Sequence, residues 1–260
     1  MVKIFKYSFS DLIRSRWSLA YFGFYLITAV ALLYLSTDLS RAVASLMNVV
    51  IILSPLIGML FGVMYYYNSR EFIELLLAQP IKRSSIFLGQ YFGLAVSLSL
   101  SFFLGILLPF IFIGSGEIKI WLNFITLIVS GVFLTFIFSA LAYFVSIRHE
   151  NKIKGFATAI ALWLFMAVIY DGIFLLLLVF FNEYPTDKLA LGIVMLNPVD
   201  QARILMMLKL DISAIMGYTG AVFQKFFGTS LGMTMSLLMS ALWVIFPVWG
   251  MIRYANRKDF

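Results

Sequence analysis

Cysteine is absent from the 260-residue sequence, and histidine occurs once, at His149. Without cysteine, the chain can form no disulfide, no thiolate metal site and no cysteine nucleophile. A single histidine excludes the HExxH zinc motif, and the sequence contains neither a GxxxxGK[ST] phosphate-binding loop nor a GxSxG nucleophile turn. No catalytic residue and no metal site is predicted. His149 itself lies in a charged turn, as a solvated loop residue or, alternatively, as a ligand.

Charge is also scarce, since charged residues make up 12% of the chain and hydrophobic residues 63%. Soluble proteins are about one quarter charged and about one half apolar. Several apolar runs reach the roughly 20 residues that a helix needs to cross about 30 Å of hydrocarbon. The sequence therefore predicts an all-α membrane protein. Its net charge of +7 is expected to act on membrane lipid and on orientation, so no nucleic-acid partner is predicted.

Six transmembrane helices are predicted within a single domain. They cover residues 17–35, 43–66, 86–113, 118–147, 155–181 and 229–252. Residues 1–16 come before them and interleave basic with apolar side chains, which is typical of an amphipathic helix at the membrane surface. Ala29 and Ala31 resemble a signal-peptidase site, but apolar sequence continues beyond them, so an uncleaved anchor is favoured.

The orientation follows from the basic residues that flank the spans. Six spans place both termini on one side of the membrane, and 13 of the 19 Lys and Arg residues fall on that side. The positive-inside rule then puts both termini in the cytoplasm. Residues 67–85 are cytoplasmic in this arrangement, and residues 182–228 face outward.

Residues 67–85 form a polar interruption with an amphipathic order of its own. Acidic and basic side chains are followed by three leucines and by a proline, which cannot donate a backbone hydrogen bond and ends a helix. This predicts a short surface helix that docks another protein, with an ordinary solvated loop as the alternative. The predicted docking residues are Arg70, Glu71, Glu74, Leu75, Leu76, Leu77, Pro80 and Arg83.

The outward segment, residues 182–228, contains two helix-start signals. Asn197 followed by Pro198 predicts one short helix, and Asp211 can cap a second. Both helices are too short to span, so they either contact an extracytoplasmic partner or cover the bundle as a lid. The predicted partner-contact residues are Asn197, Pro198, Asp200, Arg203 and Tyr218.

Asp171 is the one acid deep in an apolar span, within IYDGIF. A carboxylate there costs a few kcal/mol on insertion scales, so it must be paired, protonated or next to water. It is a candidate for the transport path. The alternatives are an interhelical hydrogen bond or a side chain that reaches the outer interface.

Two further patterns concern packing. Glycine pairs at spacing four, Gly58/Gly62, Gly89/Gly93 and Gly228/Gly232, predict close helix approach. Methionine is concentrated in the C-terminal part of the chain, where it is either a flexible filler of apolar gaps, the favoured interpretation, or a soft ligand path for Cu(I).

The polar interruption resembles a known family. Its RE..E.LLLAQP.KRS..FLGQY, from Arg70 to Tyr91, is similar to the first cytoplasmic loop of ABC-2 type permeases, and DLIRSRW, from Asp11 to Trp17, is similar to their elbow helix. The resemblance covers nearly the whole chain. Phe72 and Ile73 stand where many relatives carry glycine, and Gln90 replaces the commoner lysine.

The resemblance implies a half-transporter with a type V exporter-like fold in the bacterial inner membrane. It would work as a homodimer, and its coupling helix would fit a cleft on a dimer of separate ABC ATPase subunits. ATP and Mg²⁺ would bind to that ATPase, and this chain would bind no cofactor. The outer segment Leu196–Gly228 is similar to the Nos-type permeases, which implies a periplasmic accessory protein and a role in copper-site maturation of nitrous oxide reductase.

Three rival functions stay open. A general ABC-2 exporter of drugs, lipids or peptides fits the same family. A secondary transporter usually has more spans and several buried ionisable groups, of which only Asp171 is apparent. A membrane-embedded enzyme would need a nucleophile or a metal constellation, and the sequence offers none.

Overall fold

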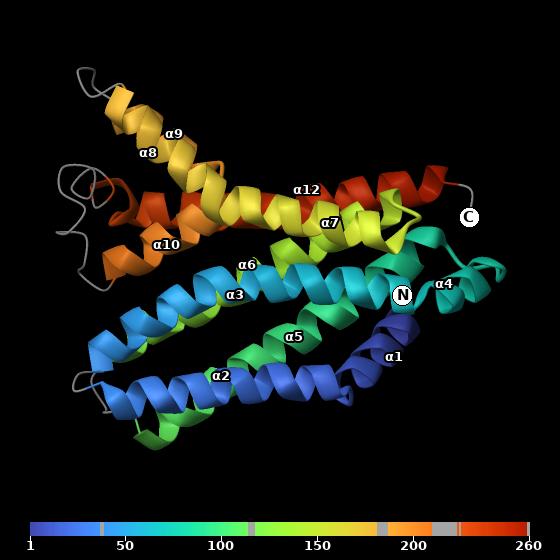
Figure 1. Ribbon diagram of the computed structural model, residues 1–260, viewed down its shortest axis with the longest axis horizontal. Helices are drawn as coiled ribbons and strands as arrows, with labels where there is room; N and C mark the ends of the chain where they lie inside the picture. The colour runs from blue at the N-terminus through green and yellow to red at the C-terminus, as the bar shows by residue number, and fades with distance from the viewer. Residues whose placement is uncertain (37–38, 114–117, 181–186, 210–222, 224, 259–260) are drawn as a thin grey trace.

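Every regular element in the described part of the chain is a helix. The computed structural model describes residues 1–36, 39–113, 118–180, 187–209, 223 and 225–258. In chain order, its main elements are α1 Val2–Ile13, α2 Arg16–Leu35, α3 Leu39–Asn68, α4 Arg70–Leu77, α5 Arg83–Ile113, α6 Ile118–Arg148, α7 Lys152–Leu164, the π-helical turn η1 Phe165–Ile169, α8 Tyr170–Phe180, α9 Asp187–Met195, α10 Pro198–Lys209 and α12 Ser230–Arg257 (Figure 1).

Six segments are long and apolar enough to cross a membrane, which confirms the predicted fold class. They are α2, α3, α5, α6, the α7–η1–α8 segment and α12. The predicted spans match them to within a few residues at each end. The predicted surface helix at the N-terminus corresponds to α1, which packs along α5. Both chain ends lie at the same end of the bundle (Figure 1), as an even number of spans requires.

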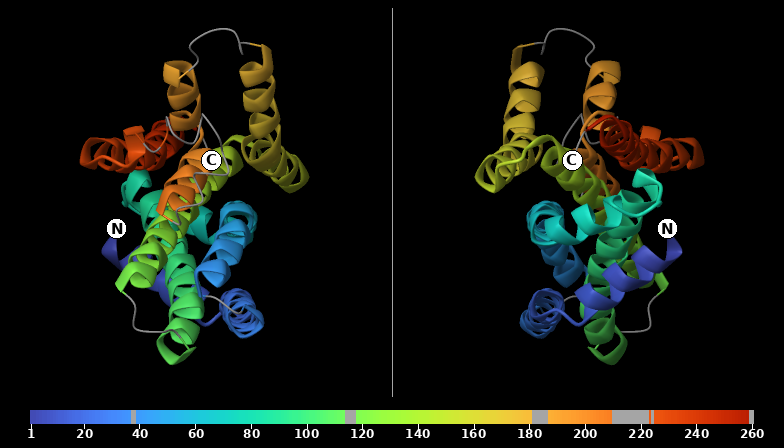
Figure 2. Two further views of the ribbon diagram at one scale, coloured as in Figure 1. Left: turned by 90° about the vertical axis from the view of Figure 1, so that its left-hand side faces the viewer. Right: turned by 90° about the vertical axis from the view of Figure 1, so that its right-hand side faces the viewer.

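α6 lies at the centre of the bundle, in contact with α3, α5 and α12. In its most apolar window 67% of the residues are buried, against 56% in α3 and in α5. The span that begins with α7 buries only 11% of its window, and α12 buries only 17%. Figure 2 shows these two spans on opposite sides of the molecule. They therefore leave most of their apolar surface to lipid or to another chain.

Two of the predicted glycine pairs bring helices together within the chain. An added Cβ at Gly93 of α5 would come 2.6 Å from the Cβ of Ser8 in α1. An added Cβ at Gly62 of α3 would come 2.5 Å from the Cβ of Ala142 in α6. Neither site has room for a methyl group, so these glycines set how closely α1 approaches α5 and α3 approaches α6.

Span five is interrupted by η1, a π-helical turn of five residues. Such widened turns occur often at functional sites. Beyond the turn, α8 stands out from the bundle beside α9 (Figures 1 and 2). α9 has no counterpart among the predicted elements. A second, smaller hydrophobic core joins α8, α9 and α10 with Phe223 and Phe227.

The first helix predicted in the outer segment, residues 182–228, is present in the structure. α10 begins at Pro198, directly after Asn197, as predicted. Of the second predicted outer helix, residues 223 and 225–227 are helical, whereas Asp211 and Tyr218 lie outside the described residues. Residues 114–117, between the third and fourth predicted spans, also lie outside the described residues.

Candidate functional site

The predicted docking segment contains a helix, α4, at the end of the molecule where both termini lie (Figure 1). The helix ends ahead of Pro80, and its inner face buries Ile73. On the outer face, 68% of Leu75 is exposed, and the neighbouring Glu71 and Glu74 are exposed as well. α4 therefore presents an apolar anchor within an acidic rim, an arrangement that protein interfaces use.

The charged residues of α4 remain at the surface. The Nε of Arg70 lies 3.0 Å from the Oε1 of Glu74, in an ion pair whose side chains are about half exposed. Such exposed pairs contribute only about 0.3–0.5 kcal/mol to stability. Leu76 and Leu77 are partly buried and pack against the core. The leucine run is thus divided, with Leu75 pointing outward and the other two anchoring the helix.

The loop before span five lies against the start of α4. The Tyr67 hydroxyl donates hydrogen bonds to the carbonyl oxygens of His149, at 2.7 Å, and Asn151, at 3.3 Å. Arg70 donates to the carbonyl oxygen of Glu150 at 3.4 Å. A Cβ at Gly155 would overlap the Tyr67 ring, so this glycine lets the loop approach. The contacts hold the loop next to the docking helix.

The C-terminal end of α12 joins the same surface. Nη1 of Arg83 donates to the carbonyl oxygen of Lys258 at 2.6 Å and to that of Ala255 at 3.4 Å. Nζ of Lys258 donates to the carbonyl oxygen of Ile147 at 3.0 Å and lies 3.9 Å from Oε1 of Glu150. Arg83, predicted as a docking residue, therefore also ties the C-terminus to α5.

We call residues 67–83, 148–154 and 253–258 together the coupling surface. These segments are distant in the sequence, and the hydrogen bonds above bring them side by side. Tyr67 and Lys258 make several of these contacts, yet neither is distinguished in the sequence, because a tyrosine or lysine beside a span is also typical of a membrane interface. His149, Arg70 and Arg83 are flagged by sequence, but none of them was flagged for these contacts.

A second polar cluster lies far from the coupling surface, where α8 meets α10. Arg203 of α10 forms an ion pair with Asp171 of α8 and lies 3.5 Å from Oδ1 of Asp200. Asp171 is therefore paired, which is one of the states predicted for a carboxylate within a span. We call Asp171, Asn197, Asp200 and Arg203 the outer polar cluster.

Asn197 links the outer polar cluster to the π-helical turn. Its Oδ1 accepts a hydrogen bond from the backbone N–H of Val199 at 3.0 Å, which caps α10. Its Nδ2 donates to the carbonyl oxygen of Met166, within η1, at 2.7 Å and to Oδ2 of Asp200 at 2.9 Å. A π-helical turn leaves carbonyl groups outside the regular α-helical pattern, and Asn197 satisfies one of them. The start of α10 is thereby joined to the bend in span five.

Burial raises the pKa of Asp200 from the usual 3.8 to about 7. The neighbouring Asp171 carboxyl acts in the same direction, whereas Arg203 and the hydrogen bond from Asn197 act against it. Two carboxyl groups share one guanidinium, so a proton on Asp200 relieves their repulsion. These effects set Asp200 to titrate near neutral pH, in a helix that is not one of the six spans.

α10 is also tied to α12. Nε2 of Gln201 donates to the carbonyl oxygen of Ser236 at 2.7 Å and to its Oγ at 2.8 Å, and both residues are buried. Gln201 was not predicted as a site residue, although a glutamine beside an aspartate in a short apolar helix is a signal that could have found it. α10 therefore connects span five with the last span.

The predicted partner-contact residues are more buried than residues that contact a partner at a surface. Asn197, Pro198 and Asp200 are buried, and the side chain of Arg203 is 24% exposed and faces Asp171. The structure thus leaves the first three without an exposed side chain, and their contact with an outer partner stays a prediction. The reason is that α10 packs against α3, α6 and α12, and does not lie on the outer surface.

His149 and two of the methionines have ordinary surroundings in the described part of the chain. Nε2 of His149 lies 3.4 Å from the Thr158 hydroxyl. Among the described residues, no group of three or more His, Cys, Asp or Glu side chains could hold a metal ion. Met206 and Met251 are buried in the main core, as fillers of apolar space are.

Comparison with known proteins agrees with this arrangement. A family model described as "ABC-2 family transporter protein" matches residues 2–259. The chain belongs to the ABC-2 transporter family. Two relatives bear the description "Probable ABC transporter permease protein NosY". The one from Pseudomonas aeruginosa is 26% identical over 256 residues, which cover 92% of this chain and 90% of the relative. The one from Stutzerimonas stutzeri is 25% identical with the same coverage.

Both polar regions belong to one membrane subunit of this family. This protein is a permease subunit of an ABC transporter. α4 lies within the segment that resembles the family's first cytoplasmic loop, and α1 overlaps the segment that resembles its elbow helix, a name we use for α1 below. Of the outer polar cluster, Asn197, Asp200 and Arg203 lie in the segment Leu196–Gly228 that resembles the Nos-type permeases, and Asp171 lies before it.

Proposed function

We propose that the permease works as a homodimer on which a dimer of separate ABC ATPase subunits docks through the coupling surface. ATP and Mg²⁺ bind to the ATPase, whose closure moves α4. This chain binds no cofactor and catalyses no covalent reaction. The docking residues are those predicted from the sequence, with Leu75 as the apolar anchor and Arg70, Glu71 and Glu74 around it.

The outer face of α4 is the observation that carries this proposal. Leu75 is exposed beside two acidic side chains, in the segment that resembles the family's first cytoplasmic loop, and a partner seated there would bury it as an apolar anchor within a polar rim. The contacts of Tyr67 and Arg70 with the loop at residues 149–151 support a rigid platform. α4 lies between α3 and α5 in the chain and contacts both, and α1 packs along α5. Movement of α4 would therefore reach α1 and these two spans.

The charge distribution supports a cytoplasmic coupling surface. Thirteen of the 19 basic residues lie on the side of the termini, the side that the positive-inside rule assigns to the cytoplasm. We therefore propose a bacterial inner-membrane location with both termini inside. An ATPase that uses cytoplasmic ATP can reach the coupling surface only in this orientation.

The uncovered faces of α7 and α12 support the homodimer. α12 lines an apolar groove of about 600 Å³ together with Leu196, and Trp243, Phe246 and Trp249 form part of its wall. Few polar groups interrupt this face, so either lipid or an apolar helix face can fill it. A second copy of the permease would supply such a face.

We further propose that the outer end serves copper-site maturation of nitrous oxide reductase, by export or by a mechanical signal to a periplasmic accessory protein. The NosY description of both relatives supports this role. The outer polar cluster joins span five to α10 and α12, so a movement of the spans would change the outer surface formed by α8 and α9. A general ABC-2 exporter would lack the accessory protein.

Co-purification tests the proposal. The permease is expressed with candidate ABC ATPase and periplasmic subunits, extracted in mild detergent, and the proteins that accompany it are identified. Recovery of both subunits supports the proposed role, and recovery of the ATPase alone supports a general exporter. If neither subunit accompanies the permease and transport persists without ATP, the protein is a secondary transporter and the proposal is wrong.

A further inference from the structure

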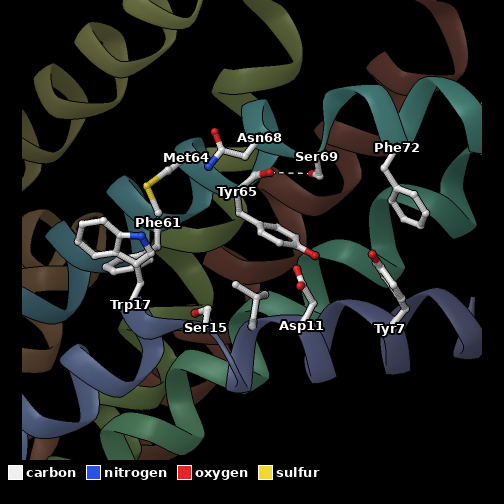
Figure 3. Close-up of a pocket in the computed structure, with 11 residues that line it drawn as sticks. Tyr7, Asp11, Ser15, Trp17, Phe61, Met64, Tyr65, Asn68, Ser69 and Phe72 are labelled. Atoms are coloured by element: carbon white, nitrogen blue, oxygen red, sulfur yellow. Dashed lines mark hydrogen bonds between the residues drawn. The ribbon is translucent and has the colours of Figure 1, made fainter.

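A pocket of about 280 Å³ lies between the elbow helix and the end of α3, with Phe72 of α4 at its edge (Figure 3). We call it the elbow pocket. Its floor and walls include Tyr7, Asp11, Ser15, Trp17 and Tyr65. Small-molecule sites typically have volumes of about 300–1,000 Å³. The elbow pocket is therefore of a size to hold a small polar group and not a large cargo.

The position of the elbow pocket is set by the ends of two spans. Trp17 lies in the first turn of α2, and Tyr65 lies in the last turn of α3. Both helix ends are on the side of the termini, and the aromatic residues that border the pocket are those that settle at the level of lipid headgroups. The pocket is therefore open to the surface layer of the membrane.

Asp11 gives the elbow pocket a negative charge. It is the only charged side chain that lines the pocket, it is exposed, and it forms no ion pair with another described residue. Arg14, one turn further along α1, is exposed but does not pair with it. An unpaired carboxylate beside lipid favours a cationic ligand.

The remaining walls suit an ammonium group. Figure 3 shows the hydroxyl end of Tyr65 directed toward Asp11, with Trp17 and Phe61 on one side and Tyr7 on the other. Ring contacts hold two of these side chains in place, since Trp17 lies 6.1 Å from Phe61 and Tyr7 lies 4.9 Å from Phe72, measured between ring centroids. Aromatic faces attract cations within about 6 Å.

Hydrogen bonding selects the kind of ammonium. Asp11 and Tyr65 line the elbow pocket with acceptor oxygens, and Ser15 adds a hydroxyl that also accepts a hydrogen bond from the backbone N–H of Ser18 at the start of α2. A primary ammonium has three N–H donors for these acceptors, whereas a quaternary ammonium has none. We infer that the elbow pocket binds the primary ammonium of a phosphatidylethanolamine headgroup from the adjacent leaflet.

The surface of α1 fits the rest of such a lipid. Lys3 and Lys6 are exposed on this helix, Arg14 is exposed directly after it, and all three supply positive charge for lipid phosphates. The acyl chains would lie along the spans, outside the pocket. Because Phe72 borders the pocket, the bound headgroup would touch the coupling helix. The inference concerns the permease alone and does not depend on its ATPase, its accessory protein or its cargo.

Native mass spectrometry tests the inference on the full-length permease. The protein is equilibrated with mixed micelles that hold equal amounts of phosphatidylethanolamine, phosphatidylcholine and phosphatidylglycerol, and the retained lipids are counted. We expect phosphatidylethanolamine to be preferred over phosphatidylcholine, and Asp11→Asn to reduce its retention about tenfold. Glu71→Gln removes the same charge from an exposed site outside the pocket and is expected to keep the preference.

A soluble competitor distinguishes a lipid headgroup from a free amine as the ligand of the elbow pocket. Glycerophosphoethanolamine carries the headgroup without acyl chains. If it displaces phosphatidylethanolamine only at a large excess, the site is a lipid site as inferred. If it displaces the lipid at equal concentration, the pocket takes free amines and the lipid assignment is wrong.

Two results would overturn the inference on the protein side. One is equal retention of the three lipids by the unaltered permease, and the other is full retention of phosphatidylethanolamine by Asp11→Asn. Should Asp11→Asn fail to fold, Trp17→Leu replaces it, because it removes a ring and leaves the carboxylate. Asp11→Glu, which keeps the charge, is expected to restore most of the retention.

Discussion

Arg203 of α10 pairs with Asp171 of α8, 32 residues earlier in the chain. The pair joins the outer part of a membrane span to a helix that does not span. Asp171 therefore has a structural role that is sufficient to explain a carboxylate at this depth. A role in the transport path stays a prediction, and the pair offers a way to separate the two.

Asp171→Leu leaves the Arg203 guanidinium without its main partner. We expect the variant to assemble but to lose stability by roughly 1–3 kcal/mol and to transport poorly, since removing one member of a partly buried pair costs more than removing both. Thermal unfolding and transport in proteoliposomes measure these effects. The double variant Asp171→Leu/Arg203→Leu is the control. If it restores both stability and transport, the role is structural; if it restores stability alone, Asp171 also serves the transport path.

The raised pKa of Asp200 predicts a pH dependence. The folded protein holds a proton on Asp200 up to about pH 7, whereas the unfolded chain releases it near pH 4. The stabilising contribution is therefore complete below about pH 4 and is lost as the pH rises through 7.

Asp200→Asn tests this dependence, because an amide stays neutral at every pH. We expect its unfolding temperature to fall less than that of the unaltered permease between about pH 5 and about pH 8. Glu71→Gln, which removes an exposed acid, should leave the dependence unchanged. Parallel curves for the unaltered permease and Asp200→Asn would contradict the prediction.

Leu75→Asp places a charge at the centre of the exposed face of α4. Because 68% of Leu75 is exposed, the change should cost little stability but should weaken ATPase docking by about 2 kcal/mol or more, as at interface hot spots. Co-purification and transport-coupled ATP hydrolysis are the measurements. Leu35→Asp is the matched control, because Leu35 is 78% exposed at the C-terminal end of α2, away from α4, and the change should leave docking intact.

Glu74→Lys reverses the charge of the acidic rim. Loss of the exposed pair with Arg70 should change stability by no more than about 0.5 kcal/mol. We expect coupling between ATP hydrolysis and transport to fall nonetheless. Wild-type coupling and co-purification in both Glu74→Lys and Leu75→Asp would refute the docking role of α4.

Gly93→Ala tests the contact between the elbow helix and α5. Its methyl group would come 2.6 Å from the Cβ of Ser8, so α1 must shift, at an expected cost of about 1–3 kcal/mol. Gly23→Ala is the control, because nothing lies within 4 Å of an added Cβ there. Unfolding temperatures in the same detergent compare the two. An equal effect of both substitutions would show that α1 does not need this close approach.

The spans and the short helix α4 were predictable from the sequence because their causes are local. A run of about 20 apolar residues has to be a buried helix in lipid, since its backbone groups find no other partners there. Pro80 and the Asn197–Pro198 pair mark helix ends through the backbone of their own neighbours. The six spans, α4 and the start of α10 were therefore predicted close to where the structure has them.

The partners of the polar side chains were not predictable in this way. Nothing near Asp171 indicates Arg203, and nothing near Tyr67 indicates the loop at residues 149–151. These contacts depend on how closely helices approach one another, which small residues at sites such as Gly62 and Gly155 permit. The burial of Asn197 and Asp200 has the same origin, and it turned predicted surface residues into interior ones.

The sequence by itself thus determined the membrane class, the number of spans, the position of α4 and the lack of an ATP-binding motif. Each of these depends on composition or on interactions within a few residues. The tertiary structure alone decided that three distant segments form one coupling surface and that the acid of span five is paired. It also decided that the elbow helix and α3 enclose a pocket. Those features depend on long-range packing, which local preferences in the chain do not specify.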